Sequence, residues 1–237
     1  MTRAETKKNK KAVSAILACV LIAVLAVGVT LAYLSTTTDP ITNNFTFLGG
    51  TDTDIDATLT EDQWVEENAK NLTPGKKVAK NPVITNTSTA DGMSEYVAMR
   101  VTFQNGDGTK LTPEQYTKLM SLITIKWSES GKWKSDASTV AANATGPVQI
   151  YYYDAVLNKD AATDALFESV TINATATNED MEWLASTSAN DDTAGKGLGG
   201  FKIYVEGAAI QAEGFEGNLT GGTTLAGTEL AKLFPSN

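Results

Sequence analysis

The residue types that most often carry catalytic chemistry are scarce in this chain of 237 residues. It contains no histidine, and its one cysteine is Cys19. Histidine is the commonest general base and the commonest metal ligand, so the usual nucleophile–base pairs and zinc sites are excluded. A catalytic site would have to use carboxylates or lysines alone. We therefore expect a protein that is not an enzyme and that holds no cofactor and no catalytic metal.

Paired carboxylates are the remaining candidates for acid–base chemistry. Glu66 and Glu67 are adjacent in the sequence, and so are Glu179 and Asp180. Acidic residues are also typical of the first turn of a helix, where they face the positive end of the helix dipole. Because short helices are expected around both pairs, solvated helix residues explain them better than catalysis does.

A third acidic pattern consists of Asp52, Asp54 and Asp56, which is similar to the start of a calcium-binding loop. A loop of the EF-hand type needs Gly at its sixth position and Glu at its twelfth. These positions hold Ala57 and Gln63. The alternation of acidic and apolar residues favours a strand with one solvated face. Calcium binding at this acidic strand is the alternative.

The N-terminal region has the features of an export signal. Five Lys/Arg among the first eleven residues precede an uncharged apolar run from Ala12 to Leu34. Positive charge stays on the cytoplasmic side during insertion, and the run is about as long as a membrane-spanning helix. Thr30 and Ala32 place small side chains at the −3 and −1 positions before Tyr33, as signal peptidase requires. We expect cleavage before Tyr33, and an uncleaved membrane anchor is the alternative.

Cleavage would leave a strongly acidic protein. Residues 1–32 contain five of the 19 Lys/Arg and one of the 28 Asp/Glu, so the remainder has 14 against 27 and a net charge of −13. Such a surface repels nucleic acids and anionic membranes. We therefore expect no nucleic-acid partner, and membrane contact only through the leader. The remainder also lacks cysteine, so no disulfide supports it after export.

Beyond the leader, the pattern predicts many short strands and few helices. Period-two alternation and β-branched or aromatic runs indicate the strands, and Thr112-Pro113 with Gln115 is a typical helix start. Strands are expected at 45–47 and 52–59, from Val78, after Pro82, and at 95–104, 148–153, 166–172 and 201–215; helices are expected within 61–71 and at 112–123, 178–184 and 223–234. A hairpin is predicted between 123–127 and 131–133. Strands without β/α alternation are typical of an antiparallel β-sandwich.

Four stretches of the sequence resemble one family of exported proteins. They are GVTLAYLS at 28–35 with NFT at 44–46, PGKKVAKNPVITNT at 74–87, YVAMRV at 96–101 and AIQAEGF at 209–215. These stretches are similar to the TasA/camelysin family of Gram-positive cell-surface and biofilm-matrix proteins, whose leader is processed by the signal peptidase SipW. Ser88 stands where that family usually has Gly. The helix at 112–123 and the loop around 190 are expected to be insertions.

The resemblance implies a fold and a partner. The fold is a mainly β, jelly-roll-like antiparallel β-sandwich with a few short helices, preceded by an N-terminal signal or transmembrane helix. The partner is a SipW-type signal peptidase. The metallopeptidase activity associated with camelysin is not carried over, because a chain without histidine has no H-E-x-x-H motif. We expect residues 1–32 to be the signal peptide, 33–50 a flexible segment or first strand, and 51–237 one sandwich domain.

Two functions fit these features. The first is a secreted matrix or cell-surface protein, a biofilm fibre-type subunit that pairs with itself and with matrix components. Cleavage would free the segment from Tyr33 to Gly49, in which Phe45 and Phe47 share a parity and could enter a neighbouring subunit as a donor strand. Alternatively, these residues form the first strand of their own domain. The second function is an adhesin-like module that binds host or matrix polymer through the loops at 106–110 and 190–199.

Overall fold

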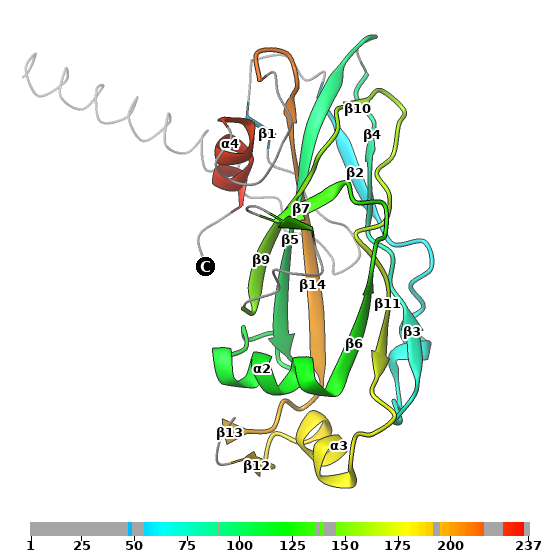
Figure 1. The fold of residues 1–237 in the computed structure, drawn as a ribbon, viewed down its shortest axis with the longest axis vertical. Helices are drawn as coiled ribbons and strands as arrows, with labels where there is room; N and C mark the ends of the chain where they lie inside the picture. The colour runs from blue at the N-terminus through cyan, green and yellow to red at the C-terminus, as the bar shows by residue number, and fades with distance from the viewer. Residues whose placement is uncertain are drawn as a thin grey trace, which may run out of the picture. The chain divides into compact units, whose positions relative to one another are not determined.

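The computed structural model describes residues 47–48, 55–89, 91–135, 138–139, 146–191, 195–215 and 225–234. All of them belong to the unit Pro40–Asn237. Within these ranges the protein is mainly β, with antiparallel sheets and three short α-helices (Figure 1). The leader and its expected cleavage site lie outside the described residues.

The largest sheet has seven strands and is built around the long strand β5 (Ser94–Asn105). Antiparallel β14 (Phe201–Gln211) pairs with one side of β5 along eleven residues, and β9 (Val148–Tyr153) pairs with the other. The strand order is completed by β1 (Phe47–Leu48) outside β14, by β7 (Trp133–Ser135) and β8 (Ser138–Thr139) beyond β9, and by β10 (Leu157–Asn158) on β5. The expected central strand at 95–104 is therefore confirmed.

Smaller sheets face the large one. One consists of β3 (Lys77–Ala79), β11 (Phe167–Ile172) and β6 (Ile123–Trp127), and another of β2 (Ala57–Thr60) and β4 (Val83–Asn86); β12 (Asn190–Asp191) pairs with β13 (Gly195–Lys196). β4 begins immediately after Pro82, as expected of a residue that cannot donate to a ladder. The helices are α2 (Pro113–Leu122), α3 (Asn178–Ala185) and α4 (Leu225–Leu233), with the 3₁₀-helix η1 (Glu66–Ala69).

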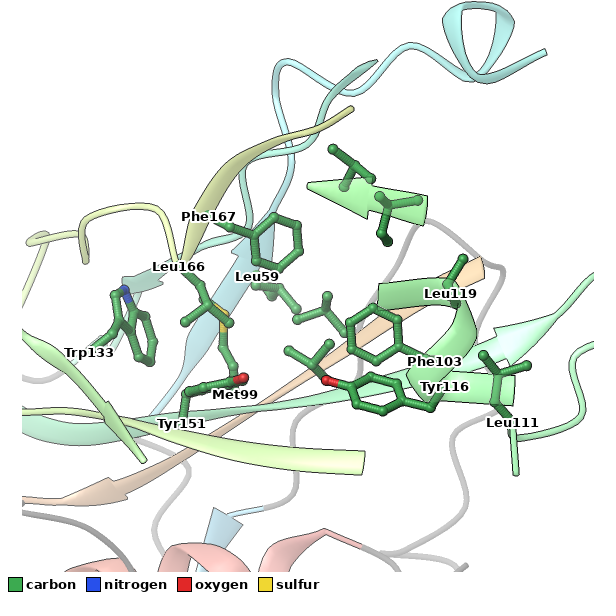
Figure 2. Packing of buried hydrophobic residues seen from close by; sticks show 14 of the residues in the cluster. Leu59, Met99, Phe103, Leu111, Tyr116, Leu119, Trp133, Tyr151, Leu166 and Phe167 are labelled. Carbon is green, nitrogen blue, oxygen red and sulfur yellow. The ribbon is translucent and has the colours of Figure 1, made fainter. Parts of the chain in front are cut away.

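The main hydrophobic core lies between the large sheet and the smaller ones. Alternate residues of β5 point into it, including Met99 and Phe103, and they meet Leu59 of β2 and Phe167 of β11 (Figure 2). Tyr116 of α2 packs edge-on against Phe103, with ring centroids 5.2 Å apart. The alternation of strand side chains thus gives one continuous apolar layer between the sheets.

A second apolar cluster covers the opposite face of the large sheet. Helix α4 packs on β14, β5 and β1, and its Leu230 and Leu233 join Phe234 in contact with side chains of β5 and β9. Tyr152 belongs to this cluster, whereas Tyr151 and Tyr153 belong to the main core. The expectation that the three tyrosines point to alternating faces and form no single platform is confirmed.

One predicted pairing is wrong. The segments at 123–127 and 131–133 do not form a hairpin, because β6 pairs with β11 in the three-stranded sheet and β7 pairs with β8 and β9 in the large sheet. The chain therefore crosses between layers over 128–132, and Gly131 adopts a positive φ of 70° in that crossing. The apolar side chains on both segments are satisfied by burial in a shared core rather than by pairing with each other.

Candidate functional site

The residues expected to act in export and assembly lie at or before Phe47, the first residue that the structure describes. Thr30, Ala32, Tyr33 and Phe45 are outside the described residues. Phe47 lies in β1, which pairs in parallel with β14 of the same chain, Phe47 opposite Ala209 and Leu48 opposite Ile210. In this structure, therefore, the described part of the candidate donor segment, Phe47 and Leu48, joins its own sheet at the outer edge of β14.

The outer edge of β14 is long compared with β1. β1 pairs with two residues of β14, whereas β5 pairs with all eleven on the other side. Residues Phe201 to Ala208 thus have no strand partner on the outer side among the residues that the structure describes. An edge of this kind presents unpaired N–H and C=O groups that can pair with another extended segment.

The direction of each β14 amide follows from two hydrogen bonds. The N–H of Ala212 donates to the carbonyl of Ser94 at 2.8 Å, and the N–H of Phe103 donates to the carbonyl of Pro147 at 2.7 Å. In an antiparallel ladder the backbone groups alternate between the two sides of a strand. Even-numbered residues of β14 therefore bond to β5, and the amides of odd-numbered residues, such as Ile203 and Val205, point to the outer edge.

The carboxylate pairs have structural partners. Glu66 and Glu67 are exposed on η1, where both pair with Lys70. Asp180 is the N3 residue of α3, and its side chain accepts from the N–H of Thr177 at 2.9 Å in a capping box. Among the described residues, no three acidic side chains are grouped so that they could hold a metal ion.

The acidic strand is only partly described. Asp52 and Asp54 lie outside the described residues, and β2 begins at Ala57, after Asp56. Within β2 the expected alternation is present, because Ala57 and Leu59 are buried and Thr58 is exposed. The amide of Asp56 donates to Ser88 Oγ at 3.1 Å.

Ser88 connects Asp56 to a buried carboxyl group that sequence reasoning did not single out. The Ser88 hydroxyl lies 2.5 Å from Glu95 Oε1, and Glu95 has no exposed surface. Its other oxygen, Oε2, is buried and has no hydrogen-bond partner among the residues that the structure describes. The pKa of Glu95 is raised to about 7, chiefly by burial and also by the charge of Asp56, while hydrogen bonds from Ser88 and from the Asp56 backbone act in the opposite direction. The sequence held a signal for this burial, because Glu95 has the same parity as the core residues of β5.

The two loops proposed for ligand binding meet at one end of the large sheet. The amide of Gly106 donates to the carbonyl of Leu198 at 3.0 Å. A Cβ at position 106 would lie 1.9 Å from the carbonyl oxygen of Gly199, so the close approach requires glycine. Within the first loop, two hydrogen bonds from Thr109 lower the pKa of the exposed Asp107. The fold thus joins loops that are about ninety residues apart in the sequence.

None of the helices in the described ranges has the length and apolar character needed to span a bilayer.

Comparisons with known proteins add little. No protein-family model matches the chain, and no curated protein matches it either. Among solved structures, a family 123 glycoside hydrolase from Clostridium perfringens is similar over 67% of this chain and 27% of its own, with 11% identity and a TM-score of 0.26. The chain thus spans about a quarter of the hydrolase's length, and a TM-score this low supports no argument about fold or activity.

Proposed function

We propose that the protein is an exported, non-enzymatic surface or extracellular-matrix protein that assembles into fibres by strand addition between subunits. The resemblance of 28–35 and 74–87 to the TasA/camelysin family supports this function, and the mainly β fold is compatible with the jelly-roll-like sandwich that the family implies. A SipW-type peptidase would release the protein from its membrane-inserted precursor to the cell surface and matrix. Its partners would then be further copies of itself and other matrix components.

The outer edge of β14 is the observation that carries the proposal. It offers the backbone groups of Phe201 to Ala208 beside the two-residue β1. A donor strand from another subunit would pair with this edge, and the outward amides of alternate residues would be its partners. Because the donor segment of one subunit would pair with the β14 edge of another subunit instead of its own, the contact is head-to-tail and gives filaments rather than closed dimers.

Deletion of Tyr33–Phe47 from the processed protein tests the proposal. We expect the truncated protein to keep its β circular-dichroism spectrum and cooperative unfolding but to form no fibres by electron microscopy. The intact processed protein is the control and should form fibres as its concentration rises. A processed protein that stays monomeric at high concentration across pH, or a truncated protein that is unfolded, would contradict the donor role.

The non-enzymatic part of the proposal has its own test: the processed protein should hydrolyse casein no faster than a buffer blank, with or without zinc.

A binding module is the second candidate, and the contact between Gly106 and Leu198 favours it. The contact brings 106–110 and the described part of 190–199 to one place, as a site made of two loops requires. Titration of the monomeric protein with matrix polysaccharide tests this function. Saturable binding that is weakened by Lys110→Ala at the loop, but not by Lys76→Ala elsewhere on the exposed surface, would support it. Absence of saturable binding would exclude this class of ligand.

A further inference from the structure

Glu95 lies where the large sheet meets the small sheet formed by β2 and β4. It is the second residue of β5 and points inward with Val97 and Met99, and none of its surface is exposed. In the two ladders it lies opposite Gln211 of β14 and Leu157 of β10. A carboxyl group without solvent contact is costly to ionise unless hydrogen bonds or opposite charges compensate.

The compensation around Glu95 is incomplete. Ser88 is its hydrogen-bonding side-chain partner at Oε1, and Oε2 is buried with none. The titratable group that acts on it is Asp56, whose like charge raises the pKa of Glu95 although the Asp56 backbone amide lowers it. The residues opposite it on β14 and β10 are Gln211 and Leu157, and the β4 residue that contacts its partner Ser88 is Asn86; none of these ionises.

Ser88 can satisfy different partners in the two protonation states of Glu95. Its Oγ lies 2.5 Å from Glu95 Oε1, 3.1 Å from the Asp56 nitrogen and 3.4 Å from the Asp56 carbonyl oxygen. A protonated Glu95 donates its O–H to Ser88, and the serine hydrogen is then free to reach the Asp56 carbonyl. An ionised Glu95 can only accept, so the serine hydrogen turns to the carboxylate and leaves the Asp56 carbonyl.

Asn86 holds Ser88 in position for this exchange. Its Oδ1 accepts from the Ser88 amide at 3.0 Å, and its Nδ2 donates to the Leu157 carbonyl at 2.9 Å. Asn86 has no exposed surface. The serine is therefore fixed between β5 and the chain that enters β2, and a change at Glu95 is transmitted to Asp56.

We propose that Glu95 and Ser88 form a pH-sensitive lock, which fastens the start of β2 to β5 while the Glu95 carboxyl is protonated and loosens it when that group ionises. Ionisation places a buried charge beside Asp56 with one oxygen unpaired, and opening of the β2 start returns that charge to water. The closed state binds the proton more tightly than the open state, so opening becomes easier as pH rises from the ordinary pKa of 4.5 to about 7.

Hydrogen exchange at two amides measures the lock directly. The Asp56 N–H donates to Ser88 Oγ, and the Thr87 N–H donates to the Asp56 carbonyl at 2.8 Å. Their protection factors, which are corrected for intrinsic exchange, should fall by up to about 70-fold between pH 5 and pH 8, if opening restores the ordinary pKa. The Asn173 amide, which donates to the Leu122 carbonyl at the end of α2, is the internal control and should not change.

Three variants of the processed protein separate the lock from a general effect of pH. Glu95→Gln should make both protection factors independent of pH. Asp56→Asn removes the like charge and should move the midpoint of the change to lower pH, whereas Asp62→Asn, at an exposed aspartate just beyond β2, should leave it in place. Flat protection in the unaltered protein, or the same pH response in Glu95→Gln, would overturn the proposal.

If Glu95→Gln does not fold, the midpoint in Asp56→Asn decides the matter, because an unchanged midpoint means that Glu95 is not the group responsible. These measurements use the monomeric protein at low concentration. Their outcome is therefore independent of whether the protein forms fibres.

Discussion

Arg100 and Glu206 lie directly opposite each other in the β5–β14 ladder, and the arginine Nε donates to Glu206 Oε2 at 2.6 Å. The guanidinium also lies 5.3 Å from the centre of the Phe234 ring, which follows α4. The pair is mostly buried, with side-chain exposures of 6% and 17%. It is therefore a charged contact inside the apolar cluster that attaches the C-terminal helix to the sheet.

Replacing one member of this pair should destabilise the protein strongly. Arg100→Ala leaves Glu206 without its partner in a largely buried place, and we expect a loss of about 3–5 kcal/mol in the free energy of unfolding, measured with urea. The double variant Arg100→Met/Glu206→Leu should recover most of that loss, because both charges are removed. Lys126→Ala is the control, since its ion pair with Glu168 is about half exposed, and it should change stability little.

Glu95 should make the global stability of the protein depend on pH in a definite direction. Its pKa is raised from 4.5 to about 7 in the folded protein. Below pH 4.5 the group is protonated in both states, so it has no effect. Between pH 4.5 and 7 the unfolded chain releases the proton first, and stability falls by up to about 3 kcal/mol. Above pH 7 the loss is complete.

The variant Glu95→Gln should remove this loss. Urea unfolding at pH 8 should show it to be more stable than the unaltered protein, and at pH 4 it should show no advantage. A variant that is less stable at both pH values would mean that the carboxyl group makes stabilising contacts when ionised. That result would contradict the unpaired position of Oε2.

Local features could be predicted from the sequence because they depend on neighbouring residues. The helix start at Thr112-Pro113 with Gln115 forms a complete capping box, in which the Thr112 hydroxyl accepts from the Gln115 amide and the Gln115 side chain accepts from the Thr112 amide. The strands at 95–104, 148–153 and 201–215 are present because each follows a two-residue alternation or a β-branched run. The bounds of β9 agree with the prediction, whereas those of β5 and β14 differ from it by one to four residues, as is usual for strand limits.

Long-range pairing could not be predicted in the same way. The segments at 123–127 and 131–133 have strand composition and a polar connector, but their partners are β11 and β9. Spacing along the chain favours a hairpin, whereas burial of Ile123 and Trp133 in a common core favours two layers. The buried Glu95 has the same origin, because its side-chain hydrogen bond comes from Ser88, whose amide in turn donates to Asn86 of β4.

The processed protein should begin at or within a few residues of Tyr33. Thr30 and Ala32 provide the small −3 and −1 side chains that signal peptidase needs, and cleavage there removes the basic cluster of the leader. Intact mass and N-terminal sequencing of extracellular material measure the new terminus. Replacing Ala32 by a bulky residue should leave the precursor in the membrane fraction. Extracellular protein that still carries Lys7 to Lys11 would show that the leader is not removed.

Assembly should depend on the outward amides of β14 rather than on its side chains. Ile203→Pro removes one outward N–H and leaves the hydrogen bonds to β5 intact, because Ile203 is an odd-numbered residue of the strand. The matched variant Ile203→Ala loses the same side chain but keeps the N–H. A lost backbone hydrogen bond is worth about 1 kcal/mol, so Ile203→Pro should raise the concentration needed for fibres roughly fivefold over Ile203→Ala.

Proline at the neighbouring position provides the opposite control. The amide of Tyr204 points to β5, opposite Thr102, so Tyr204→Pro breaks the central ladder and should lower the melting temperature of the monomer far more than Ile203→Pro does. Light scattering and electron microscopy measure assembly, and circular dichroism confirms that the variants are folded. If Ile203→Pro and Ile203→Ala form fibres at the same concentration, the outer edge of β14 is not the acceptor, and strand addition at this edge is excluded.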